Sequence, residues 1–176
     1  KPWDAKHVLP WAQIKTVWES YWNKDKPVLL EKSPPNIIRT RDILANFEPV
    51  KFLIMVRNPY AHSEGLMRRN NMSVERAANF SMMCLRTELN NACELDNALV
   101  LTYESLVLNP VKVRQKIADF IPSLNDMNFE ASFKLDSVEG TLTRPITDLN
   151  TQKIASLSAD TIAAMNDVFS QHQKTV

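Results

Sequence analysis

The feature that most constrains the fold is an uninterrupted apolar run, Phe52 to Val56, followed at once by Arg57 and Pro59. Such a run is typical of a strand that is buried on both faces of a parallel sheet. Proline suits the first turn of a helix, so a helix is predicted to begin at Pro59. A strand that ends in arginine and leads directly into a helix indicates a ligand site at the carboxyl edge of an α/β sheet. We therefore expect an anion, most often a phosphate, at Arg57; the alternative is an arginine that caps a surface turn.

The helix predicted after Arg57 carries an unusual stripe. At helical spacing Asn58, His62, Gly65 and Arg69 fall on one face. A glycine inside a helix costs about 1 kcal/mol relative to alanine, and Gly65 is one of only two glycines in the chain. The missing side chain would let a ligand approach the backbone closely. The alternative is a solvated polar face with an incidental glycine.

A second cation is predicted at a neighbouring strand end. Residues 28–31 are interpreted as a short strand, which Lys32 and the two prolines after Ser33 bring to an end. Residues 36–47 form a predicted crossover helix that leads to the strand at residues 52–56. Strand, helix and strand of this length make a right-handed βαβ unit. Lys32 and Arg57 are then expected to project from the same edge of adjacent parallel strands.

The remaining elements complete a single α/β domain over residues 1–176, with three layers around a short parallel sheet. An aromatic stripe on the helix predicted at residues 10–23 either packs in the core or lines a pocket. The other predicted elements are a long helix at 73–95, a strand at 98–102 leading into Tyr103, a helix from Asn109-Pro110 to Pro122, an irregular loop at 123–148 across the site, and a last helix capped by Ser158.

Net charge and hydropathy exclude several classes of partner. The net charge is +1, so no long-range field draws the chain to nucleic acid or to an acidic membrane, and no nucleic-acid partner is expected. No run of 18 apolar residues exists, so no membrane span is predicted. Cys84 and Cys93 lie on opposite faces of one predicted helix, too far apart for a disulfide. Two buried thiols favour the cytoplasm, with the Golgi lumen as the alternative.

Several catalytic motifs are missing from the sequence, and their absence limits the types of reaction that the chain could catalyse. With two glycines, the chain holds neither a Walker-type phosphate loop nor a G-x-G-x-x-G turn. No spacing of Cys and His indicates zinc, and no metal is expected. What remains is a set of cations and one phenol at strand ends and in a loop: Lys32, Arg57, Arg69, Tyr103 and Arg144. Such groups suit transfer of an activated anionic group, where positioning and charge stabilisation carry most of the catalysis.

Three segments in order resemble the sulfotransferases that use 3'-phosphoadenosine-5'-phosphosulfate (PAPS): LEKSPPN, ANFEPVKFLIMVRNPYAHSEGLMRR and VLTYESLVLNP. The likeness spans residues 28–121, with a fainter match through Arg144, and is nearest to the Golgi and bacterial types, including protein-tyrosine sulfotransferases. The resemblance implies a P-loop-NTPase-like α/β/α fold. It also implies transfer of a sulfuryl group from PAPS to a hydroxyl or amine of a protein tyrosine, a glycan or a small molecule.

The resemblance implies a role for each of the five residues. Arg57 would bind the 3'-phosphate of the nucleotide, and Arg69 and Tyr103 would contact the same nucleotide. Lys32 would act as the catalytic residue that stabilises charge on the bridging oxygen and the sulfuryl group. Arg144 matches a lysine of the family's late loop in charge only.

The chain also departs from the family. The family's serine at the position of Gly65 is missing, and His62 is better placed on the helix than Ser63 to replace it. The loop that grips the 5'-phosphosulfate lies upstream of Lys32 in the family, and residues 1–26 contain nothing like it. The sequence therefore predicts an incomplete domain with no assigned catalytic base.

Two other functions remain open at the level of sequence. One is a degenerate sulfotransferase that binds adenosine 3',5'-bisphosphate without turnover. The other is a different nucleotide-dependent transferase, such as a kinase, which the lack of phosphate-loop glycines disfavours.

Overall fold

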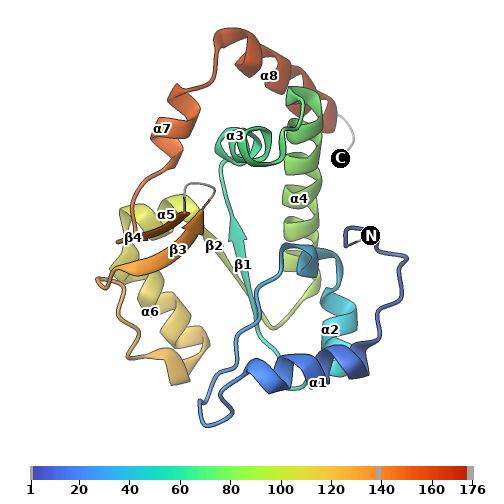
Figure 1. Cartoon of the computed structure of the whole chain (residues 1–176), viewed down its shortest axis with the longest axis vertical. Helices are drawn as coiled ribbons and strands as arrows, with labels where there is room; N and C mark the ends of the chain where they lie inside the picture. Colours follow the sequence, from blue (N-terminus) through green and yellow to red (C-terminus); the bar gives the residue numbers. More distant parts are fainter. Residues whose placement is uncertain (1, 138–139, 174–176) are drawn as a thin grey trace.

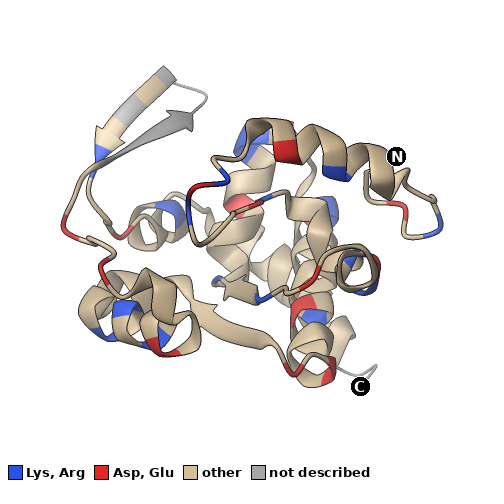
Figure 2. Ribbon diagram, turned by 90° about the horizontal axis from the view of Figure 1, so that it is seen from below, with Lys and Arg blue, Asp and Glu red and all other residues tan. Residues whose placement is uncertain are grey.

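The computed structural model describes residues 2–137 and 140–173 as a mixed α/β chain (Figure 1). Its elements are α1 (Trp11–Tyr21), η1 (Pro34–Ile38), α2 (Thr40–Asn46), β1 (Phe52–Val56), α3 (Pro59–Asn70), α4 (Val74–Glu94), β2 (Ala98–Thr102), α5 (Tyr103–Leu108), α6 (Pro110–Phe120), η2 (Pro122–Leu124), β3 (Phe133–Ser137), β4 (Gly140–Arg144), α7 (Asn150–Ala155) and α8 (Ala159–Gln173). Lys and Arg are interspersed with Asp and Glu along these helices (Figure 2).

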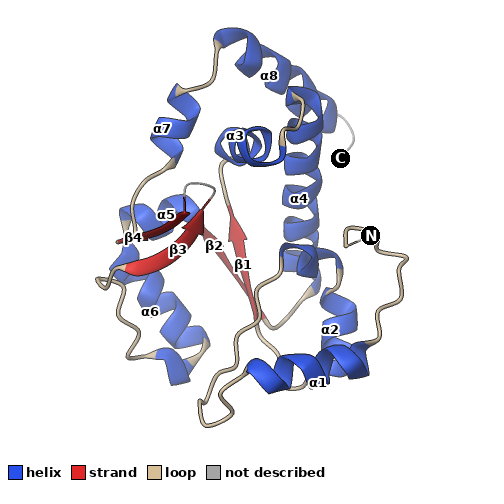
Figure 3. Ribbon diagram, viewed as in Figure 1, coloured by secondary structure: helices blue, strands red, loops and turns tan. Residues whose placement is uncertain are grey.

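The central sheet is a parallel pair of strands, β1 and β2, that lies among the helices (Figure 3). The register pairs Phe52 with Ala98 and Val56 with Thr102, and helices α3 and α4 make the connection between the two strands. Both strands were predicted, and both are confirmed. Because parallel strands end at the same edge, Arg57 and Tyr103 are the first residues beyond the paired strands.

Helices cover the two faces of this sheet unequally. Helix α4 packs against both strands, and α6 packs against β2, where Leu101 is buried against Val113 and Ile117. On β1, Ile54 is buried, whereas Leu53 and Met55 on the opposite face are 40% and 41% exposed. The prediction that this strand is buried on both faces is therefore wrong, because α6 lies over β2 and leaves that side of β1 open.

A second core joins α3, α4 and α8. Met165 is fully buried together with Ala78, and the ring of Tyr60 meets Phe169 edge-on with 5.0 Å between ring centroids. The predicted cap of α8 is confirmed, since the backbone N–H of Thr161 donates to Ser158 Oγ over 3.1 Å. This core fixes α3 beside α4, and α3 carries the stripe that the sequence singled out.

The predicted strand at residues 28–31 is not formed. Leu29 and Leu30 are 42% and 75% exposed, and the Leu30 carbonyl accepts a hydrogen bond from the indole of Trp22 (2.9 Å) instead of one from a neighbouring strand. The predicted βαβ unit of residues 28–56 is therefore wrong. The parallel partner of β1 is β2, so the sheet does not bring Lys32 beside Arg57.

The aromatic stripe of α1 both packs and lines a cavity. Trp18 stacks on Phe47 with 5.2 Å between centroids, and Trp11 meets Trp18 edge-on. Trp11 and Trp18 also line an open cavity of about 470 Å³ together with Arg39. Tyr21, at the end of α1, is 85% exposed.

The helix predicted at residues 36–47 is split into η1 and α2 around Arg39. The Arg39 side chain is 4% exposed and donates to the backbone carbonyls of Ala5 and His7, so it anchors the amino-terminal segment. Within α2, Ile43 is buried and Leu44 is 38% exposed.

The carboxyl-terminal half differs from the prediction in three further places. The segment at 123–148, predicted to be irregular, contains the antiparallel hairpin of β3 and β4. Two short helices, α5 and α7, were not predicted. Cys84 is buried but Cys93 is exposed, so the prediction of two buried thiols is wrong for Cys93; the described chain pairs neither cysteine in a disulfide.

Candidate functional site

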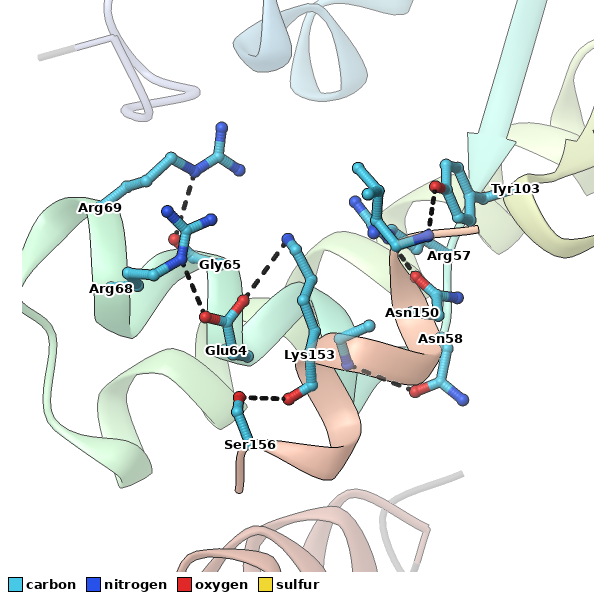
Figure 4. Close-up of polar contacts among 12 residues, drawn as sticks. Arg57, Asn58, Glu64, Gly65, Arg68, Arg69, Tyr103, Asn150, Lys153 and Ser156 are labelled. Atoms are coloured by element: carbon cyan, nitrogen blue, oxygen red, sulfur yellow. Dashed lines mark hydrogen bonds and ion pairs between the residues drawn. The ribbon is translucent and has the colours of Figure 1, made fainter. Parts of the chain in front are cut away.

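Arg57 and Tyr103 meet where β1 and β2 end (Figure 4). The guanidinium carbon of Arg57 lies 4.2 Å from the centre of the Tyr103 ring, which is a cation–π contact. Each residue directly follows its strand, and the parallel register places the two at the same edge. The structure thus brings together two of the five site residues that the sequence predicted.

Asn150 holds the Arg57 side chain in place. Arg57 Nε donates to Asn150 Oδ1 over 2.8 Å, and Asn150 Nδ2 donates to Glu104 Oε1. The same carboxylate oxygen accepts from the backbone N–H of Asn58 at 2.9 Å. Burial lowers the pKa of Arg57, an effect that the nearby Tyr103 and Glu104 oppose. Arg57 Nη2 is buried and donates no hydrogen bond within the described residues, so one end of the guanidinium is left for a ligand.

The start of α3 is closed by its own cap. Asn58 Oδ1 accepts from the backbone N–H groups of Tyr60 (3.0 Å) and Ala61 (3.4 Å), and Pro59 occupies the first helical position as predicted. The Asn58 side chain therefore takes the N–H groups that an anion would otherwise use. Anion binding near Arg57 relies on side chains and not on this helix terminus.

Gly65 lies on the buried side of α3 and faces two cations. A Cβ atom at Gly65 would lie 3.1 Å from Lys153 Nζ and 3.3 Å from Arg69 Nη2. Arg69 Nε also donates to the Gly65 carbonyl at 3.3 Å. The space that the sequence predicted for a ligand beside Gly65 is occupied by the side-chain ends of Arg69 and Lys153.

Glu64 is the carboxylate nearest to these cations. It accepts a hydrogen bond from Arg68 Nε at 2.9 Å and lies 3.5 Å from Lys153 Nζ. The Lys153 and Glu64 side chains are only 14% and 10% exposed. Burial lowers the pKa of Lys153, and Arg57 lowers it further, while Glu64 raises it. The site thus contains a mostly buried ammonium group, that of Lys153, whose pKa is lowered by the charge of Arg57.

The same positive charges affect the pKa of His62. Burial lowers the pKa of His62, and Arg57, Arg69 and Lys153 each lower it further. The imidazole is therefore neutral at pH 7, because its ordinary pKa is already below that value. Ser63 faces away and donates to Ser81 Oγ of α4 at 2.9 Å, which agrees with the expectation that Ser63 cannot serve the site.

The hydroxyl of Tyr103 is engaged by the backbone that leads into α7. It donates to the Thr147 carbonyl (2.8 Å) and accepts from the Leu149 N–H (3.1 Å). Tyr103 therefore offers its ring to the site and uses its hydroxyl to hold the α7 segment. This segment carries Asn150 and Lys153 to Arg57 and Gly65, so Tyr103 is a structural link as well as a site residue.

The other two predicted site residues lie outside this cluster of contacts. Lys32 is exposed in an irregular segment, and no hydrogen bond or ion pair joins it to another described residue. Arg144 ends β4 and is half-buried, with Nε lacking a hydrogen-bond partner in the described part of the chain. The structure thus joins Arg57 to Tyr103 by a direct contact and places Arg69 beside Gly65 and Lys153, whereas no hydrogen bond or ion pair links Lys32 or Arg144 to these residues.

Sequence reasoning missed Asn150, Lys153 and Glu64. A signal for α7 was present, because Asp148 Oδ1 accepts from the Asn150 N–H at 2.7 Å, and aspartate just before a helix is a start signal. The docking of α7 onto α3 is a contact between distant segments, which periodicity does not reveal.

No protein-family model matches the chain, and no curated protein or solved structure matches it. Within the described residues, no three His, Cys, Asp or Glu side chains gather closely enough to hold a metal ion. No helix in that part of the chain has the length and apolar character needed to cross a membrane. The function is therefore argued from the site and from the sequence resemblance.

Proposed function

We propose that the chain is a PAPS-dependent sulfotransferase domain and that Arg57 and Arg69 bind the 3'-phosphate of the nucleotide. The observation that carries this proposal is the buried, unpartnered Nη2 of Arg57 beside the Tyr103 ring at the carboxyl edge of a parallel sheet. Ligands of open α/β sheets bind at this edge, and a guanidinium with free donors suits a phosphate. The geometry supports an anion site, and the resemblance in sequence supplies the identity of the anion.

The reaction would be an in-line transfer. The acceptor oxygen or nitrogen attacks sulfur, the bond between sulfur and the bridging oxygen breaks, and adenosine 3',5'-bisphosphate leaves. The proton of the acceptor passes to water. Arg57 and Arg69 would hold the 3'-phosphate and so align the sulfuryl group with the acceptor. Lys32 would offset the charge that develops on the bridging oxygen, and Arg144 would add a contact to the nucleotide.

A second candidate is a module that binds adenosine 3',5'-bisphosphate without turnover. The position of Lys32 favours it, because the exposed side chain makes no polar contact with described residues and no strand fixes its direction. Catalysis by a charged group depends on its being held in place before the reaction. A kinase is the weakest alternative, since a phosphate loop needs glycines that the chain lacks.

The test is a calorimetric titration with adenosine 3',5'-bisphosphate, with adenosine 5'-monophosphate as the matched ligand that lacks the 3'-phosphate. We expect saturable binding of the bisphosphate and binding at least tenfold weaker for the monophosphate, because only the former reaches Arg57. Equal affinities, or no binding at all, would remove both the enzyme and the binding module.

Turnover separates the remaining two functions. Radiolabelled PAPS is incubated with tyrosine peptides, glycans and small phenols, and label on the acceptor is measured. Transfer to any acceptor supports the enzyme, whereas tight binding without transfer to any of them supports the module.

A further inference from the structure

The space beside Gly65 is the starting point, because two cations from different elements border it. Lys153 of α7 and Arg69 of α3 would lie 3.1 Å and 3.3 Å from a Cβ atom at this position. Like charges that approach one side-chain-free patch repel each other unless an anion lies among them.

Lys153 is only partly satisfied by its carboxylate. Its Nζ lies 3.5 Å from Glu64 Oε2, whereas a charged hydrogen bond between ammonium and carboxylate spans about 2.7–2.9 Å. Glu64 Oε2 is buried and accepts no hydrogen bond from any described residue. The other oxygen of Glu64 is taken by Arg68 at 2.9 Å. The ammonium of Lys153 therefore keeps N–H donors for a further partner.

The balance of charge around this space is positive. Arg57, Arg69 and Lys153 act on one another, since each of the first two lowers the pKa of Lys153. The carboxylate that faces Lys153, Glu64, is shared with Arg68. Figure 4 shows the Lys153 side chain extending between Glu64 of α3 and the end of β1 where Arg57 lies. An incoming dianion would relieve this repulsion.

We propose that Lys153 is a third cation of the anion site, and that Glu64 is an internal counterion which holds the ammonium until the ligand's phosphate takes it over. The ligand group is a phosphate monoester, whose two charges match the surplus of cations better than the single charge of a sulfate ester. This inference rests on the proposed function for the nucleotide that carries the phosphate.

The two residues make opposite predictions for affinity. Removal of the ammonium in Lys153→Ala weakens binding of adenosine 3',5'-bisphosphate by about 10- to 100-fold, as expected for loss of a charged hydrogen bond. Removal of the competing carboxylate in Glu64→Gln tightens binding by about 3- to 10-fold, because the ligand no longer displaces an ion pair. A purely structural ion pair predicts that both variants weaken binding.

The control for net charge is Lys112→Ala, since Lys112 is an exposed lysine of α6. We expect its affinity to stay within about twofold of the unmodified protein, because exposed charges far from a site are screened by salt. Thermal unfolding of every variant checks that each is folded before titration.

The outcomes separate this inference from the proposed function. If the unmodified protein binds adenosine 3',5'-bisphosphate but Lys153→Ala binds it equally well, or Glu64→Gln binds it more weakly, the inference is overturned and the function stands. If Lys153→Ala does not fold, the Glu64→Gln result decides alone.

Inorganic pyrophosphate is titrated into the same proteins to test whether the site binds phosphate groups even if it does not bind the nucleotide. If the nucleotide does not bind but pyrophosphate does, the proposed function fails, and the effects of the Lys153 and Glu64 variants on pyrophosphate decide the inference. If neither ligand binds, both proposals are overturned.

Discussion

Arg57 and Lys32 were both predicted as cations of the site, but their surroundings differ. Neighbouring residues hold the Arg57 side chain in place, and the Lys32 side chain has no such contacts with described residues. Arg57 stacks on Tyr103, donates to Asn150 and ends a strand whose partner runs beside it along its whole length. Lys32 lies in an irregular, exposed segment and makes no polar contact with described residues. Both residues were identified by the same reasoning, namely that a strand delivers a charged side chain to its carboxyl end.

The difference shows that an apolar run can position a charged side chain at its end only when it pairs with a neighbouring strand. The run at residues 52–56 pairs with residues 98–102, and each has apolar residues facing a covering helix. The run at residues 28–31 is apolar as well, yet its backbone is held by Trp22 and its leucines face solvent. A short apolar run is therefore weak grounds for a strand-end site unless its neighbour in the sheet is known.

The largest effect is expected at Arg57. We expect Arg57→Ala to weaken binding of adenosine 3',5'-bisphosphate by at least about 100-fold, because the free Nη2 donor and the guanidinium charge stacked on Tyr103 are lost together. Calorimetry measures the change, with Arg86→Ala on an exposed position of α4 as the control. Equal affinity for Arg57→Ala and the unmodified protein would make Arg57 a structural residue only.

Lys32→Ala sharpens the contrast, because it is expected to act on rate and not on binding. If the chain is an enzyme, we expect the transfer rate to fall by about 10- to 100-fold with the affinity for the nucleotide unchanged. Single-turnover transfer of radiolabel and calorimetry measure the two quantities separately. A loss of affinity in Lys32→Ala would show that Lys32 belongs to the same anion site as Arg57.

The next prediction concerns the effect of Glu88 on folding stability. Glu88 lies on α4, the helix that packs against both α3 and η1. Burial raises the pKa of Glu88 to about 7 from an ordinary value of 4.5. Below pH 4.5 the carboxyl is protonated in both states, and as pH rises towards 7 the unfolded chain ionises first, so folding stability falls. Above pH 7 the loss is complete.

We therefore expect Glu88→Gln to stabilise the protein by about 1–3 kcal/mol at pH 8, after allowance for partial exposure, and to have little effect near pH 4. Urea unfolding at the two pH values measures the difference. Glu130→Gln, at an exposed position, is the matched control. The same stabilisation at both pH values would mean that Glu88 ionises normally in the folded protein.

The smallest effect on stability is expected for Gly65→Ala. Alanine favours a helix interior by about 1 kcal/mol over glycine, but the added Cβ must move Lys153 Nζ from 3.1 Å by a few tenths of an ångström. We expect stability to rise by less than about 1 kcal/mol while affinity for the nucleotide falls a few-fold. Thermal unfolding and calorimetry check the pair of results, and unchanged affinity would show that no ligand reaches Gly65.

The sequence was sufficient for those parts of the fold that depend on neighbouring residues. Strands β1 and β2 and the Pro59 start of α3 follow from local pattern. The Asn58 cap and the contact of Arg57 with Tyr103 were not predicted, because Asn58 was assigned to the stripe of α3 and residues 28–31 were expected beside β1. The likeness of three short segments led to the same residues, although no broader comparison extends it.

The missing parts depend on contacts between distant segments. Lys153 reaches Gly65 only because α7 docks on α3, and Asn150 reaches Arg57 by the same route. Their residue types carry no signal by themselves, since lysine and asparagine are common on exposed helices. The wrong strand at residues 28–31 has the same origin, because the competing hydrogen bond from Trp22 cannot be read from a periodicity.

The buried amide of Asn150 has a consequence for the chemistry of the whole edge. It stands between a guanidinium and a carboxylate, with its oxygen towards Arg57 and its nitrogen towards Glu104. The amide therefore gives each ion a hydrogen-bond partner that carries no charge, although Glu104 still acts on Arg57 through space and raises its pKa. Loss of this one amide would leave Arg57 Nε without its acceptor, so the guanidinium would no longer be held against the Tyr103 ring from that side.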